Sequence, residues 1–125
     1  MKINLSTLDQ ALTGVKKYKN IIVGFSGGID SSVLLYGVCL LAKKGLLRSE
    51  IKAIHVNHGL NDSCEEWESF CKKICSAYNV VLEVKTLEGL TKQPNLYSEG
   101  FLRKERYREF ESALDQDSVL LLAHH

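Results

Sequence analysis

The sequence lacks the features of a membrane-spanning or secreted chain and of a strongly basic nucleic-acid clamp. Its longest nearly apolar run, residues 33–42, is too short to cross a bilayer, and its first ten residues contain no apolar signal-peptide core. The formal net charge is only +1, so any basic surface is local. We therefore expect a cytoplasmic protein with no membrane partner.

Cysteine and proline are also scarce, with four of the former and one of the latter in 125 residues. Cys39, Cys64, Cys71 and Cys75 form neither a CxxC pair nor the spacing of a zinc ribbon. This pattern favours reduced thiols that pack in the interior. Cys71 and Cys75 in particular lie on one face of a predicted helix. The length suits one small domain over residues 1–125.

Apolar periodicity predicts alternating helices and strands. Thr7 with Gln10, and Ser63 with Glu66, have the spacing of capping boxes at helix starts. The predicted helices cover residues 7–17, 31–43, 63–78 and 98–114, and the predicted strands cover 21–25, 51–56, 80–85 and 118–123. The strands begin roughly thirty to forty residues apart with a helix in each gap, which is the size of a βαβ unit.

These elements predict an α/β fold, a parallel doubly wound sheet with helices on both faces. The strand order 3-2-1-4 would place the reversal of winding between the first and fourth strands. Ligands of such sheets bind outside the carboxyl ends of the strands, at this reversal. The polar segments 26–31, 57–60 and 124–125 follow strands and are therefore candidate binding segments.

The segment IIVGFSGGIDSSVLL, residues 21–35, places two glycines and three serines between a buried strand and a helix. Glycine permits positive φ and close backbone approach, and the amides of a first helical turn attract anions, so we expect a phosphate-bearing ligand. The alternative is an ordinary connection in which Ser26 or Ser31 caps the helix. A Walker-type Gly-Lys-Ser/Thr is absent. Asp30 either binds Mg²⁺ between itself and a phosphate or complements the helix dipole.

SGGIDS, residues 26–31, resembles the SGGxDS signature of the PP-loop ATP pyrophosphatase superfamily. The resemblance implies cleavage of ATP between the α and β phosphates, with Mg²⁺ as a further cofactor bound through Asp30. It also implies a role in nucleotide binding for each residue of the turn: Ser26, Gly27, Gly28, Ile29, Asp30 and Ser31.

Three more segments resemble the tRNA(Ile)-lysidine synthetase family in particular. They are HVNHGL at residues 55–60, the pattern of Glu99, Arg103, Arg106 and Tyr107, and Ala123-His124-His125. The resemblance adds His55, Asn57 and His58 to the nucleotide-binding residues. From the sequence alone, His55 is equally well explained as a packed strand residue and His58 as a solvated loop residue.

The helix at 98–114 supplies an independent observation. Glu99, Arg103, Arg106 and Phe110 fall within an arc of roughly 60°, so charges interrupt an apolar stripe near the expected ligand. We predict three catalytic residues, Asp30, Arg103 and Arg106, of which the arginines hold a phosphate or the negative charge developing on pyrophosphate. The alternative is an i,i+4 ion pair between Glu99 and Arg103.

The resemblance implies a ligase that adenylates the C2 oxygen of the wobble cytidine of tRNA(Ile) with a CAU anticodon, after which free lysine displaces AMP. Family members continue beyond Ala-His-His, so we expect the fold to be truncated before its fifth strand and the domain to be incomplete at its C-terminus. We expect this chain alone to bind ATP weakly and to form no lysidine at a useful rate. Competing interpretations are a tRNA thiolase, an NAD or GMP synthetase, or a non-catalytic nucleotide-binding module. A homodimer is left open.

Overall fold

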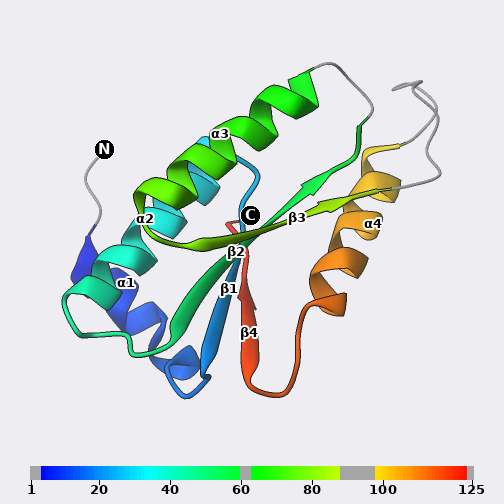
Figure 1. Cartoon of the computed structure of the whole chain (residues 1–125). Coiled ribbons are helices and arrows are strands. Elements are labelled where there is room, and N and C mark those ends of the chain that lie inside the picture. The colour runs from blue at the N-terminus through cyan, green and yellow to red at the C-terminus, as the bar shows by residue number, and fades with distance from the viewer. Residues whose placement is uncertain (1–3, 60–62, 88–97, 124–125) are drawn as a thin grey trace.

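The computed structural model describes residues 4–59, 63–87 and 98–123, which form a four-stranded parallel sheet with helices on both faces (Figure 1). The sheet order is β3-β2-β1-β4, which confirms the predicted order. The elements are α1 (Leu5–Ala11), the short 3₁₀ helix η1 (Thr13–Val15), β1 (Asn20–Gly24), α2 (Ile29–Lys43), β2 (Glu50–Asn57), α3 (Ser63–Ala77), β3 (Val81–Thr86), α4 (Glu99–Ser112) and β4 (Ser118–Leu121). Among the described helices, none combines the length and the apolarity needed to cross a membrane.

The two faces of the sheet bury separate apolar clusters because successive strand residues point to opposite sides. On one face, α1, α2 and α3 cover Ile21, Val23 and Ala53. On the other face, α4 covers Ile22 and Ile54 and contributes the buried ring of Phe110 (Figure 1). Strand residues buried on both sides explain why β1 reads as a continuous apolar run in the sequence.

Helix starts differ from the sequence prediction by two residues at α1 and α2, and by one residue at α4, which begins at Glu99. The first helix begins at Leu5, and its N-cap is Asn4, whose side chain accepts a hydrogen bond from the amide of Thr7 at 3.1 Å. The predicted capping box at Thr7 is therefore wrong, because Asn4 already satisfies that amide. The second box depends on the side chain of Ser63, which lies outside the described residues. Helix α2 begins at Ile29, two residues earlier than predicted, with Gly28 as its N-cap.

The register brings the carboxyl ends of three strands to one edge. Strand β1 pairs in parallel with β2 through Ile21↔Ile51 and with β4 through Ile21↔Val119. Pairing continues one residue beyond β1, since the amide of Phe25 donates to the carbonyl of Ile54 at 2.8 Å. The crossover from β1 to β2 runs through α2 on one face, whereas the crossover from β3 to β4 runs through α4 on the other face, so the winding reverses between β1 and β4, as predicted.

The predicted packing role of Cys71 and Cys75 is confirmed. Both thiols are fully buried in the cluster between α3 and the sheet. Burial raises the pKa of Cys71 to about 12 and that of Cys75 to about 11, from an ordinary value of 9.0. Nearby acidic groups, Cys75 for Cys71 and Cys39 for Cys75, raise these pKa values further. Both side chains therefore remain neutral in the folded protein over the physiological pH range.

These pKa values predict a loss of stability at alkaline pH. Below pH 9 both folded and unfolded states keep the thiols protonated, whereas above it only the unfolded chain ionises. The free energy of unfolding should fall by about 1.4 kcal/mol per pH unit for each thiol, until the pH reaches the folded pKa. Urea unfolding from pH 8 to 10.5 measures this slope. Cys71→Ala and Cys75→Ala should each have a shallower slope than the parent chain, and equal slopes in all three proteins would contradict the linkage.

Candidate functional site

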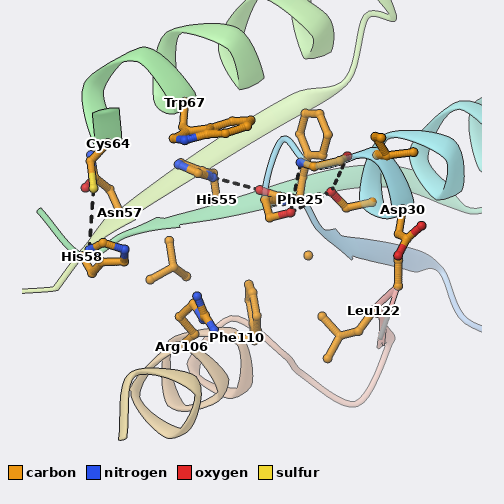
Figure 2. A pocket seen from close by; sticks show the side chains of 17 residues that line it. Phe25, Asp30, His55, Asn57, His58, Cys64, Trp67, Arg106, Phe110 and Leu122 are labelled. Atoms are coloured by element: carbon orange, nitrogen blue, oxygen red, sulfur yellow. Dashed lines mark hydrogen bonds between the residues drawn. The ribbon is translucent and has the colours of Figure 1, made fainter. Parts of the chain in front are cut away.

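A pocket of about 400 Å³ lies at the carboxyl edge of the sheet, a volume that suits a nucleotide-sized ligand. It spans the ends of β1, β2 and β4 and is bordered by the first turn of α2, the start of α3 and the inner face of α4 (Figure 2). The lining residues are Gly24, Phe25, Ser26, Gly28, Ile29, Asp30, Ser31, His55, Val56, Asn57, His58, Cys64, Trp67, Arg106, Phe110, Leu122 and Ala123. The pocket therefore sits at the predicted reversal of winding.

The turn between β1 and α2 depends on Gly27, which has φ +87°. A side chain at this position would point toward α3. Its Cβ would lie 2.9 Å from Cε3 of Trp67 and 3.3 Å from Sγ of Cys71. Gly27 is buried and does not line the pocket. Its role in this structure is thus to let α3 pack against the turn, whereas its neighbour Gly28 lines the pocket directly.

Two serines hold the turn closed. The Ser26 and Ser31 hydroxyls lie 3.0 Å apart, and the Ser31 hydroxyl also accepts from the Ser26 amide at 3.2 Å. The Ser26 hydroxyl accepts from the Gly28 amide at 3.2 Å. Ser31 lies inside α2 and is buried, so it does not act as the helix cap considered from the sequence. The first-turn amides of an α-helix have no acceptor within the helix itself, and the first turn of α2 lies at the edge of the pocket.

Asp30 is exposed in the first turn of α2 and lines the pocket, and Ile29 beside it is 70% exposed. Within the described residues, no group of three or more His, Cys, Asp or Glu side chains is arranged to hold a metal ion. The Asp30 carboxylate at this pocket nevertheless fits Mg²⁺, since this ion keeps several waters and is commonly bound by one or two carboxylates together with substrate phosphates. The chemistry of the site is therefore compatible with a phosphate-bound Mg²⁺.

His55 both lines the pocket and supports its floor. The ring is only 5% exposed, and Nδ1 lies 2.9 Å from the carbonyl oxygen of Phe25. Because a carbonyl only accepts, Nδ1 carries the hydrogen of this bond. The Cys71 thiol donates to the same carbonyl at 3.9 Å. His55 thus fixes the end of β1 to β2 and α3, which agrees with the packed position considered from the sequence.

Asn57 uses both ends of its side-chain amide within the chain. Its oxygen accepts from the Gly59 amide at 2.8 Å, and its nitrogen donates to Glu68 at 3.2 Å. This hydrogen bond, together with Lys72, holds the pKa of Glu68 below its ordinary value. His58 is half-buried, with Nδ1 at 3.6 Å from Sγ of Cys64. Asn57 therefore positions the loop after β2, and His58 reaches the pocket from it.

The two predicted arginines are placed differently. Arg106 is half-buried and lines the pocket from α4, beside Phe110 and opposite Trp67 and His55 (Figure 2). Arg103 is exposed and is not among the lining residues. The side chain of Glu99 lies outside the described residues, so the proposed ion pair with Arg103 does too. His124 and His125 are also outside them. Of the two arginines, Arg106 is the one that lines the pocket.

Sequence reasoning missed the apolar wall of the pocket. Trp67 is 47% exposed and shares a helical face with Cys64 and Cys71. Because α3 follows β2, the beginning of this face lies at the carboxyl edge of the sheet. This order of elements could have identified Trp67 as a pocket residue from the sequence. Gly24 and Leu122 form the floor next to Phe110, whose Cζ would lie 3.1 Å from a Cβ on Gly24. No sequence signal identified this close approach.

Sequence comparison finds similarity to one domain family and to curated tRNA(Ile)-lysidine synthases. The family model of the PP-loop domain matches residues 2–125. The tRNA(Ile)-lysidine synthase of Buchnera aphidicola subsp. Acyrthosiphon pisum is 39% identical over 107 residues, covering 86% of this chain and 23% of that protein. The synthases of Photorhabdus laumondii (37% over 109 residues) and Coxiella burnetii (34% over 113 residues) match 87% and 90% of this chain. This chain spans 24% of the length of each of those two relatives.

Solved structures support the fold. The U34-tRNA thiolase NcsA from Methanococcus maripaludis superposes with a TM-score of 0.74 at 20% identity, over 97% of this chain and 44% of that one. The NH₃-dependent NAD synthetase from Campylobacter jejuni gives 0.61 at 12% identity, over 98% of this chain and 58% of that one. At such identities the likeness concerns the fold alone. Because the family model covers nearly the whole sequence, this chain belongs to the PP-loop domain family.

Proposed function

We propose that this chain is the ATP-binding part of a tRNA(Ile)-lysidine synthetase. The observation that carries the proposal is the convergence of the α2 first turn, Asp30 and Arg106 on one pocket at the carboxyl edge of the sheet. Backbone amides, a carboxylate suited to Mg²⁺ and a guanidinium are together the groups that a triphosphate requires. The choice of tRNA(Ile) and lysine as substrates rests on the names of the relatives.

The reaction has two steps, each with a defined bond change. The C2 oxygen of the wobble cytidine attacks the α-phosphorus of ATP, and the bond to the bridging oxygen breaks to release pyrophosphate. The ε-amino nitrogen of lysine then attacks C2, the C2–O bond breaks, AMP leaves and the nitrogen loses a proton. The oxygen is a poor leaving group until it carries AMP, which explains the need for ATP.

The chain's own groups align the triphosphate and stabilise its charge. The amides of Ile29, Asp30 and Ser31 and the α2 dipole would hold the β and γ phosphates. Arg106, approaching from α4, would neutralise charge that develops on pyrophosphate. Mg²⁺ bound through Asp30 would supply additional neutralisation of the phosphates. On the side of the pocket formed by β2 and the loop after it, the nucleotide would contact the lining residues His55, Asn57 and His58.

A requirement for both co-substrates tests this assignment. The full-length protein should release AMP from α-labelled ATP only when tRNA(Ile) with a CAU anticodon and lysine are both present. Other PP-loop enzymes, such as a tRNA thiolase or an NAD or GMP synthetase, would need different acceptors. AMP release with tRNA but independent of lysine would overturn the proposal. Nucleotide binding without any AMP release would indicate a non-catalytic module.

Gly28→Ala should weaken ATP binding without unfolding the chain. Gly28 has φ −74°, which alanine adopts freely, and an added Cβ would have only the Ser26 hydroxyl nearby, at 3.3 Å. Loss of an N-cap glycine costs no more than about 1 kcal/mol of stability. The methyl group would stand beside the first-turn amides, so affinity should fall about tenfold or more, equivalent to about 1.4 kcal/mol.

Fluorescence of Trp67, the only tryptophan in the chain, reports this binding because its ring lines the pocket. Titration with ATP and Mg²⁺ should change the emission of the parent chain at lower nucleotide concentration than that of Gly28→Ala. Gly14→Ala is the matched control, since no atom lies within 4 Å of its added Cβ and Gly14 is not a lining residue. Equal affinities for both variants would count against phosphate binding at this turn.

A further inference from the structure

Cys64 occupies a position that the proposed reaction does not use. It is the second residue of α3, its side chain is 7% exposed, and it lines the pocket. Its Sγ lies 3.6 Å from Nδ1 of His58, which lines the same pocket from the loop after β2 (Figure 2). A thiol and an imidazole thus contact each other at the edge of the pocket in which the proposed function places ATP.

The other three cysteines are placed differently. Cys39, Cys71 and Cys75 do not line the pocket. Burial raises the pKa of all three thiols, to about 12 for Cys71 and about 11 for Cys75. The thiolate is the reacting form, so a raised pKa lowers the reactive fraction at these three positions. Of the four cysteines, Cys64 is the one that lines this pocket, and its Sγ lies beside Nδ1 of His58.

Two neighbours of Cys64 are suited to assist the chemistry of a thiol. The imidazole of His58 can accept the thiol proton, and the amino-terminal end of the 15-residue helix α3 stabilises negative charge. Glu65 and Glu66 in the same turn oppose this effect, but both are exposed and their charges are screened by solvent. We propose that Cys64 is a covalent modification site for low-molecular-weight disulfides, that His58 acts as its base, and that the modified side chain blocks the nucleotide pocket.

The modification is a balanced exchange that needs no other oxidant. The Cys64 thiolate attacks one sulfur of the disulfide, and a new S–S bond joins that half to the protein as the original S–S bond breaks. The other half leaves as a thiolate and receives the proton that His58 removed. A glutathionyl group attached here would occupy the pocket of about 400 Å³, so ATP could not bind at the same time. The blocking step rests on the proposed function.

Glutathione disulfide is the probe for the test. The full-length protein is treated for increasing times, and peptide mass spectrometry gives the modification rate at each cysteine of this chain. Cys64 should be modified at least about tenfold faster than Cys39, and His58→Gln should slow this rate about tenfold. ATP affinity should fall in proportion to the modified fraction and return after reduction. Cys64→Ser should have the same affinity before and after treatment.

The outcomes separate the two proposals. Faster modification of Cys39, or a rate at Cys64 that does not change in His58→Gln, would overturn the reactive pair whatever the pocket binds. Modification of Cys64 with unchanged ATP affinity would overturn the blocking step. If untreated protein binds no ATP while Cys64 still reacts rapidly and with dependence on His58, the proposed function fails and the modification site stands.

Discussion

Arg106→Ala in the full-length protein is expected to lower kcat for lysidine formation by about 10²- to 10³-fold, the usual effect of removing one group that stabilises transition-state charge. Arg106 is the arginine that lines the pocket, and its half-buried guanidinium faces the side formed by β2 and α3. Charge interactions there are screened less than at the surface. Steady-state kinetics with saturating ATP, tRNA and lysine measure the loss.

Two other arginines on α4 provide the controls. Arg108 is exposed and pairs with Glu105 at 3.6 Å, so Arg108→Ala should leave kcat within about twofold. Arg103→Ala should have an effect of less than about tenfold, because the side chain does not reach the pocket. Equal losses for Arg103→Ala and Arg106→Ala would show that the position of Arg106 in the pocket is not what matters.

Arg106→Lys distinguishes charge from geometry. Lysine keeps the positive charge but lacks the planar fork that binds two phosphate oxygens at once. We therefore expect partial recovery, with kcat between those of the parent and Arg106→Ala. Urea unfolding of each variant checks that the loss is not one of stability. A kcat for Arg106→Lys no higher than that of Arg106→Ala, with unchanged stability, would show that bidentate binding is essential.

The fold could be predicted because its signals are local and agree with one another. Ile21–Val23 and Ile51–Val56 read as apolar strands, the gaps between strands have the length of helical crossovers, and the crossover rule leaves few orders. Helix starts were less certain because several polar residues compete to cap one helix. Asn4 does so in place of Thr7, and no pattern in the sequence distinguishes the two.

The site was predicted as far as sequence order allowed. Residues that follow strands, such as Ser26 and Asn57, necessarily reach the carboxyl edge of a parallel sheet. The packing of α3 against the turn is a property of tertiary structure, so Trp67 was missed and Gly27 was expected to face a ligand. Helical periodicity identified the arc of Arg103 and Arg106, but it could not tell which member is close enough to the strands to reach the pocket.

Gly27→Ala is expected to cause the largest loss of stability of any substitution considered, about 2–5 kcal/mol. Two effects add at this residue. The φ of +87° is unfavourable for alanine by about 1–2 kcal/mol. The new methyl group would also lie 2.9 Å from the ring of Trp67, and such overpacking costs about 1–3 kcal/mol because a rigid aromatic cannot give way locally. Urea unfolding followed by far-UV circular dichroism measures the loss, since this signal does not depend on Trp67.

Gly45→Ala separates the two effects. Gly45 has a similar φ of +78° at the end of α2, but no atom lies within 4 Å of its added Cβ. It should therefore lose only the conformational part, about 1–2 kcal/mol. The double variant Gly27→Ala/Trp67→Ala should show a coupling that relieves the clash, since removal of the ring removes the contact. Equal losses of stability for Gly27→Ala and Gly45→Ala would mean that Trp67 of α3 does not pack against the turn at Gly27. The wall of the pocket that Trp67 forms would then lie elsewhere.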